Sequence, residues 1–141
     1  MKKLLFLLLS GAVLFSCSNK ENSEEESADW KELDAFHKIM AEAYHPLKDS
    51  GDLAPTKQLI KQLADEAEKW SNSELPEKVD TPEMKEKLEK LKINARVLES
   101  EVQKGAADSI VMTKMNLLHD QFHGIMEAWH SKEADDEHEN H

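Results

Sequence analysis

Cysteine is almost absent from this chain of 141 residues, and its single occurrence at Cys17 excludes several kinds of protein. One thiol cannot form a disulfide within the chain. Covalent attachment of a c-type haem requires a C-x-x-C-H motif, which the sequence does not contain. A cysteine nucleophile or a thiolate metal site is not expected either, because Cys17 lies where we predict lipid attachment, as described below.

Sequence motifs of the common enzyme classes are also absent. The chain has only four glycines and four prolines, and it has no glycine-rich phosphate loop, nucleophile elbow or cysteine dyad. Three carboxylate-x-x-His spacings, at Asp34–His37, Glu42–His45 and Glu127–His130, leave a dinuclear metal site as an alternative. We predict that the protein is not an enzyme.

Residues 1–16 have the features of a bacterial lipoprotein signal peptide. A basic start is followed by an apolar run from Leu4 to Phe15, which is shorter than the roughly 20 residues that a helix needs to cross a bilayer. The sequence Leu-Phe-Ser-Cys that ends at Cys17 resembles the lipobox, in which the cysteine is lipidated and becomes the first mature residue. An ordinary secretory signal is the alternative. We predict a lipid anchor at Cys17 in the bacterial envelope, on the periplasmic or the surface face of the outer membrane.

Basic residues are fewer than acidic ones along the whole chain. Residues 17–28 follow the signal as a polar, acidic stretch, which is predicted to be a solvated tether. This stretch is similar to the acidic signals of surface-exposed lipoproteins of Bacteroidetes. The formal net charge is −11, and the loss of Lys2 and Lys3 with the signal peptide would lower it to −13. Such a charge argues against nucleic acids and anionic membrane surfaces as partners.

Residues 29–131 contain four windows in which apolar residues repeat at helical spacing, and none that alternates like a strand. The expected helices run over about 29–44 or slightly beyond, 55–70, 82–104 and 107–131. Asp29 and Glu32 suit a capping box, and Pro46 is expected to end the first helix. Because short connections favour antiparallel neighbours, we predict one all-α domain, an antiparallel up-down-up-down four-helix bundle. A solvated, charged tail is expected over 132–141.

The same spacing predicts the buried face of each helix. The expected stripe of the first helix is Trp30, Leu33, His37, Met40, Tyr44 and Leu47. The stripe of the second is Leu59, Leu63, Ala67 and Trp70, with Ile60 and Ala64 beside it. The stripe of the third is Met84, Leu88, Leu91, Ala95, Leu98 and Val102. The stripe of the fourth is Val111, Met115, Leu118, Phe122, Ile125 and Trp129.

Helix lengths and connections give the chain a family resemblance. The connection before the third helix is long and ends in Thr81–Lys85, and a short Lys104–Gly105 connection precedes the fourth. In these features the chain resembles the small periplasmic b-type cytochromes and, more distantly, the cytochrome c′ bundles. The resemblance covers about residues 30–130 and implies the same four-helix fold.

The resemblance also implies a ligand. In that family, haem is held non-covalently by one methionine of the first helix and one histidine of the last. On this chain, His37 or Met40 would be the first ligand and His119 or His123 the second. The chain offers more candidate ligands than a haem needs, and we therefore place a metal ion ahead of haem.

Histidines are confined to the first helix, the last helix and the tail. The seven positions are His37, His45, His119, His123, His130, His138 and His141. The two middle helices have none, and imidazole is a common ligand of metal ions and of haem. The distribution predicts a ligand site between the first and last helices.

The rise of an antiparallel helix pair, about 1.5 Å per residue, predicts which candidates are level. His45 should lie level with His119, Met40 with His123, and His37 with Met126 or His130. His119 and His123 are four residues apart and offer two nitrogens from one helix face. The predicted ligands of the metal or haem are His37, Met40, His45, His119, His123, Met126 and His130.

The identity of the metal stays open between copper and zinc. Thioether with imidazole suits copper, and imidazole with carboxylate suits zinc. Each candidate also has an ordinary structural explanation. Methionines on helix stripes usually fill cores, and His45 next to Pro46 suits the C-terminal end of a helix. A structural or adaptor lipoprotein without a metal is the remaining alternative.

Overall fold

The structure, a computed structural model, describes the backbone of residues 30–138 and the side chains as far as Lys132. Within the described backbone there are four α-helices, one turn of 3-10 helix and no strand. These elements are α1 (Lys31–Ser50), α2 (Ala54–Ser71), η1 (Glu77–Val79), α3 (Pro82–Gln103) and α4 (Asp108–His138). The predicted all-helical bundle is confirmed. The predicted signal peptide, Cys17 and the tether over 17–28 lie outside the described residues.

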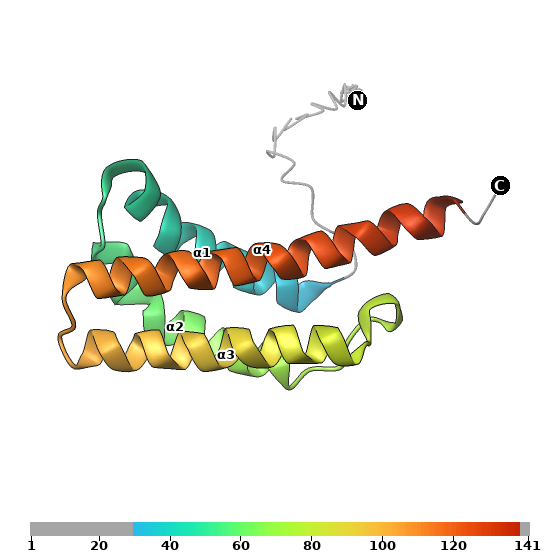
Figure 1. The fold of residues 1–141 in the computed structure, drawn as a ribbon, viewed down its shortest axis with the longest axis horizontal. Helices are drawn as coiled ribbons and strands as arrows, with labels where there is room; N and C mark the ends of the chain where they lie inside the picture. Colours follow the sequence, from blue (N-terminus) through green and yellow to red (C-terminus); the bar gives the residue numbers. More distant parts are fainter. Residues whose placement is uncertain (1–29, 139–141) are drawn as a thin grey trace, which may run out of the picture.

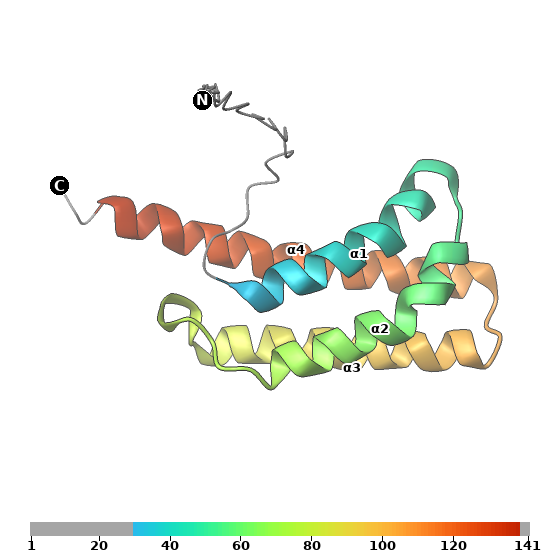
Figure 2. The same ribbon diagram turned by 180° about the vertical axis from the view of Figure 1, so that it is seen from behind.

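Each helix packs against the next one along the chain, and α1 also contacts α4 (Figures 1 and 2). Trp30, directly before α1, contacts Trp70 near the end of α2 and Trp129 in the later half of α4. The start of α1 and the end of α4 therefore lie at the same end of the molecule (Figure 1). None of the helices in residues 30–138 combines the length and the apolar character needed to cross a bilayer.

The first helix ends later than the sequence predicts. α1 continues through Pro46 to Ser50 and ends at Gly51, whose left-handed φ of 73° allows its N–H to donate to the Leu47 carbonyl. Pro46 removes one backbone hydrogen bond and crowds the carbonyl of the preceding turn, but burial of Leu47 favours continuing the helix for one more turn. At the other end Trp30 is the N-cap, without a side-chain capping bond. The predicted partner Asp29 lies outside the described residues.

The ends of the other helices follow local signals. Thr81 Oγ1 accepts a hydrogen bond from the Met84 N–H at 3.1 Å and caps α3, and Gly105 has a φ of 73° after it. The α4 backbone stays helical to His138, whereas the sequence predicts an end at Ser131. The extension over 132–138 contains neither glycine nor proline, so nothing in it stops a helix.

The predicted core stripes are confirmed for the last two helices and in part for the first, where Trp30, Leu33, Met40 and Leu47 are buried as predicted. All six predicted residues of α4 are buried, as are five of the six in α3, where Val102 is half-buried. In α1, His37 is exposed and Tyr44 half-buried. The residues that α1 buries are Leu33, Phe36, Ile39, Met40, Ala43 and Leu47. Two apolar stripes overlap on α1, and the core takes the one with more apolar area, which contains Phe36 and Ile39.

Five aromatic side chains form one cluster at the end of the bundle where α1 begins. This aromatic cluster consists of Trp30, Phe36, Trp70, Phe122 and Trp129, each at most 1% exposed. Neighbouring rings lie 5.1–5.5 Å apart between centroids, a normal packing distance for aromatic pairs. The Lys78 Nζ covers the Trp129 ring from outside at 3.3 Å. The cluster joins α1, α2 and α4.

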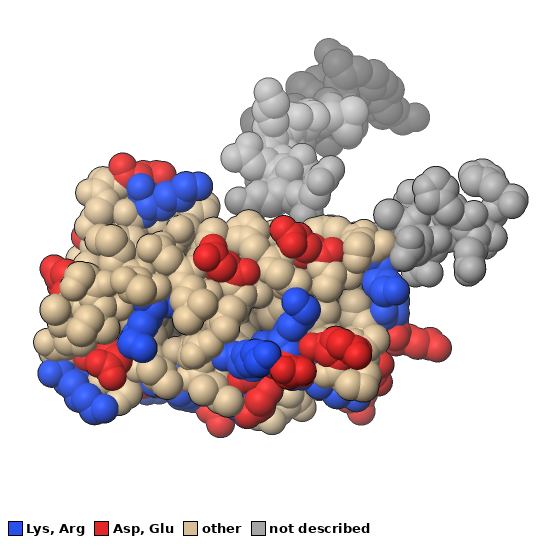
Figure 3. All heavy atoms as spheres, viewed as in Figure 1, with Lys and Arg blue, Asp and Glu red and all other residues tan. Residues whose placement is uncertain are grey.

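Charged side chains cover the outside of the bundle. Acidic and basic residues are interspersed on the face shown in Figure 3 rather than gathered by sign. Arg96 of α3 pairs with Asp65 and Glu68 of α2 and with Glu99 on its own helix. This shared arginine connects the two middle helices, which carry none of the histidines.

Candidate functional site

A cavity of about 250 Å³ lies between α1 and α4. The α4 residues that line it are His119, Phe122 and His123. The α1 residues that line it are His37, Met40, Ala41, Tyr44, His45 and Lys48. Positions 37, 41, 44 and 48 follow helical spacing and share one face of α1. We call this space the histidine cavity.

The two α4 histidines are already close enough to share an ion. Their Nε2 atoms are 3.1 Å apart, and their ring centroids are 4.4 Å apart. Two nitrogens bound to one tetrahedral zinc ion at roughly 2.0–2.1 Å would be about 3.3 Å apart. The same distance also suits a hydrogen bond in which one ring donates and the other accepts. In both cases the Nε2 atoms of His119 and His123 face each other.

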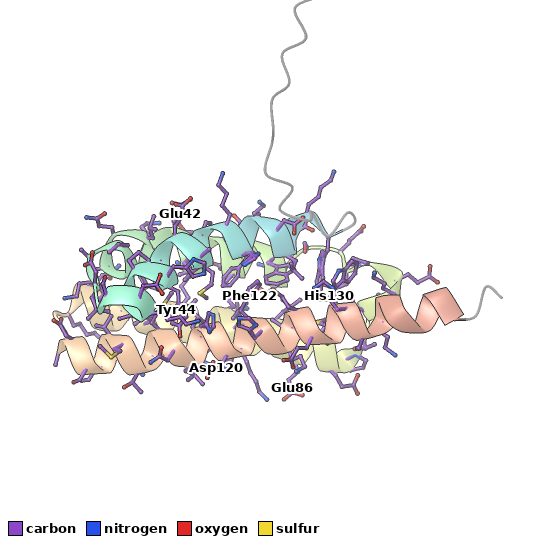
Figure 4. All side chains as sticks on the ribbon, turned by 90° about the horizontal axis from the view of Figure 1, so that it is seen from above. Glu42, Tyr44, Glu86, Asp120, Phe122 and His130 are labelled. Atoms are coloured by element: carbon purple, nitrogen blue, oxygen red, sulfur yellow. The ribbon has the colours of Figure 1, made fainter. Side chains whose placement is uncertain are left out.

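His119 is held in place by Tyr44 across the helix pair. The two rings stack with centroids 3.8 Å apart and an interplanar angle of 20°, and the His119 side chain is 20% exposed. Figure 4 shows Tyr44 between the α1 and α4 ribbons. The predicted level of His119 along α1 is therefore correct to within one residue, since Tyr44 precedes His45.

The surroundings of His119 favour the neutral ring. Burial lowers the pKa of His119 below its ordinary value, and positive charge on His123 and Lys48 lowers the pKa further. The neighbouring Asp120 opposes this shift, but its Oδ1 is 3.7 Å from His119 Nδ1, beyond hydrogen-bond distance. Nδ1 is buried without a hydrogen-bond partner. A neutral imidazole is the form that binds metal ions.

The remaining predicted ligands divide into two groups. His37, Met40 and His45 line the histidine cavity; both histidines are exposed, and Met40 is only 1% exposed. His37 lies opposite Phe122, with ring centroids 5.3 Å apart, rather than opposite Met126 or His130 as predicted. Met126 and His130 do not line the cavity.

Met126 and His130 have different surroundings on α4. Met126 is half-buried against the core, and the side chain of His130 is exposed. In Figure 4, His130 lies farther along α4 than Phe122, toward the C-terminal end. Both residues lie away from the point where the α4 imidazoles converge.

The site brings two imidazoles together rather than three or more candidate ligands. Among the described side chains, no three His, Asp, Glu or Cys residues are grouped so that they could hold one metal ion. A volume of about 250 Å³ is also below the roughly 300–1,000 Å³ of typical cofactor sites. A haem would therefore require α1 and α4 to move apart.

Sequence reasoning did not identify Tyr44 and Lys48 as cavity residues. Tyr44 is expected from the sequence to be a packing residue, and Lys48 has no predicted role. Both lie three or four residues from another lining position, so the spacing from His37 onward would have placed them on the cavity face. The apolar residues on the same face, such as Met40, favour the core instead, so the spacing alone does not reveal a cavity.

A larger depression of about 460 Å³ lies by the connection between α2 and α3. Its charged residues include Asp80 and Lys85, which pair with each other at 2.6 Å. It contains none of the predicted ligands. The histidine cavity is thus the space that brings the candidate chemistry together.

The fold and the cavity define a class of protein, a four-helix bundle with a histidine-lined cavity between its first and last helices. No protein-family model, curated protein or solved structure matches the chain. Any function proposed for it depends on the residues described above.

Proposed function

We propose that this protein is a lipid-anchored metal-binding protein of the bacterial envelope, in which His119 and His123 bind a copper or zinc ion. The observation that carries the proposal is the 3.1 Å separation of their Nε2 atoms, close to that of two nitrogens on one ion. The lowered pKa of His119 supports it, because the shift favours the neutral ring, which is the form that binds metal ions.

Helix α1 forms the opposite wall of the site. Tyr44 orients the His119 ring by stacking, and Met40 contributes a soft thioether to the lining. Thioether next to imidazole favours copper, whereas the two imidazoles alone suit zinc equally well. His37 and His45 are exposed on the same wall, where side-chain rotation would bring them toward a bound ion.

The finer architecture belongs to the same proposal. We place the helices in an antiparallel up-down-up-down order, supported by the contacts of Trp30 with Trp70 and Trp129 and by the stack of Tyr44 on His119. A lipid on Cys17 and the tether over 17–28 would hold this bundle at the membrane, as the signal sequence indicates. Metal buffering or delivery, without catalysis, is the role that fits an accessible site of few ligands.

Metal titration of the full chain, purified in detergent, tests the proposal. His138 and His141 are replaced by alanine in every sample, so that the tail cannot bind the ion. We expect His119→Ala with His123→Ala to weaken copper or zinc binding at least about 100-fold against a competing chelator, because both nitrogens are lost. The matched control is His130→Ala, the same change on the same helix but outside the cavity.

Helix content, followed by circular dichroism, separates loss of binding from loss of folding. His123→Gln alone serves as a second variant, because His123 is exposed and its replacement leaves the core unchanged. Unchanged metal affinity in the folded double variant would contradict the site. An absorption band of bound haem in the purified protein would instead favour the cytochrome resemblance.

A further inference from the structure

The metal site proposed above leaves coordination positions unfilled by protein. Zinc and copper ions usually take four ligands or nearly four, and a site with open positions completes its set from solution. His119 and His123 supply two nitrogens, and the described side chains contain no third His, Asp, Glu or Cys grouped with them. The open positions of the ion would face the histidine cavity.

The lining of that cavity is unusual for so acidic a chain. The sequence contains 29 acidic residues, yet none of them lines the cavity. The lining polar groups are four imidazoles, the Tyr44 hydroxyl and the Lys48 ammonium. The neighbouring carboxylate of Asp120 lies beside Nδ1 of His119 rather than beside the paired Nε2 atoms. The cavity therefore offers hydrogen-bond donors and positive charge to whatever enters it.

Lys48 is the permanent positive charge of this lining. It lies on the same face of α1 as Tyr44, one turn later, and its charge acts on the His119 ring. An anion bound to the metal would extend from the α4 imidazoles toward α1, where the Lys48 ammonium lines the cavity. The metal ion and the ammonium would both attract the anion, and each would strengthen its binding.

We propose that the ion on His119 and His123 takes a small anion from solution, of the carboxylate, carbonate or azide type, and that Lys48 pairs with it. This inference rests on the proposed metal site. The step is a ligand exchange in which the anion replaces a water molecule on the metal, and the oxidation state is unchanged. The site would then carry a metal–anion pair, which suits the transfer of the ion to and from small anionic carriers.

The test uses azide and the full chain in detergent, loaded with Cu²⁺ and carrying the two tail substitutions. Azide bound to Cu²⁺ gives a charge-transfer absorption band, so titration with azide reports binding directly. We expect a saturable band, and roughly three- to fivefold weaker azide binding in Lys48→Gln, which removes the charge without adding a metal ligand of the carboxylate type. Lys38→Gln is the matched control, since Lys38 is exposed on the same helix but does not line the cavity, and its effect should stay within about twofold.

The outcomes separate this inference from the proposed function. Copper content, measured by elemental analysis before and after the titration, shows whether the ion is bound at all. Failure to bind copper, and also zinc added in its place, would overturn the metal site and, with it, the anion. Bound copper without an azide band, or equal azide affinity in the Lys48 and Lys38 variants, would overturn the anion inference and leave the metal site intact.

Discussion

The same two helices, α1 and α4, meet in two different ways along their length. In the aromatic cluster, Trp30 and Trp129 make a dry contact, and both are at most 1% exposed. At the histidine cavity, Tyr44 and His119 stack beside a space of about 250 Å³, and His123 is exposed. One contact excludes solvent and the other leaves polar nitrogens accessible.

This difference shows how stability and function are divided along the bundle. Large buried rings stabilise a fold mainly through the apolar area that they remove from water. Because the aromatic cluster provides that area, the other part of the helix pair is free to contain polar groups that add little stability. Pro46 lies beside this part, and in Figures 1 and 2 the end of α1 leads away from α4. A less tightly closed helix pair is what a ligand cavity requires.

The largest predicted effect tests the aromatic side of the comparison. Trp70→Ala should lower the free energy of unfolding by about 3–5 kcal/mol, because it removes a fully buried indole from the cluster. Trp70→Phe keeps a ring, and the indole N–H has no protein partner to lose, so we expect about half that cost or less. Urea unfolding followed by circular dichroism measures both. Equal stability of the wild type and Trp70→Ala would break the comparison.

An intermediate effect is expected where α2 is joined to the cavity wall. The buried Thr56 Oγ1 donates to the Ala43 carbonyl at 2.7 Å, directly before Tyr44 on α1. Thr56→Val keeps the shape and removes this hydrogen bond, which should cost about 1–2 kcal/mol in urea unfolding. Metal binding should weaken more in Thr56→Val than in Trp70→Phe, since Thr56 bonds directly to the α1 wall and Trp70 reaches the cavity only through Phe122. Equal metal affinity in both variants would show that the Thr56 hydrogen bond does not position this wall.

The smallest effect is a dependence of stability on pH in the metal-free protein. Because the native pKa of His119 lies below its ordinary value of 6.5, the unfolded chain takes up a proton first as the pH falls. The stabilisation is complete above pH 6.5 and is lost as the pH falls through 6.5 toward the lowered native pKa. Urea unfolding at several pH values should show this loss, and His119→Gln should reduce it. Trp70→Phe should retain the full slope, because the aromatic cluster has no titratable group.

The sequence predicts the last two helices better than the first, for a physical reason. On α3 and α4 the core buries the predicted apolar stripe, and apolar residues off that stripe, such as Ile93 and Leu117, stay exposed. Thr81 and Gly105 mark the ends of α3. On α1 two stripes overlap, and only tertiary packing decides that Phe36 is buried and His37 exposed. The local sequence pattern cannot predict which stripe is buried, because this depends on the apolar area that each stripe buries against α2 and α4.

The candidate site was predictable in part for the same reason. The spacing of His119 and His123 on α4 is local, and the structure places both rings together. Which residues of α1 line the cavity depends on how that helix is rotated about its own axis. The sequence does not fix this rotation, and it therefore predicts Met126 and His130 as site residues instead of Tyr44 and Lys48. The register of α1 against α4 also fixes His37 opposite Phe122, which helix rise alone predicts only to within about one turn.

The central claim is that His119 and His123 hold a transition metal, and the metal content of the native protein tests it most directly. The full chain, purified from a bacterial envelope without added metal, would be measured for copper, zinc and iron and for its absorption spectrum. We predict about one copper or zinc per chain, no haem band, and loss of the metal in the double alanine variant. Protein that is free of metal and also fails to bind added copper or zinc would contradict the account.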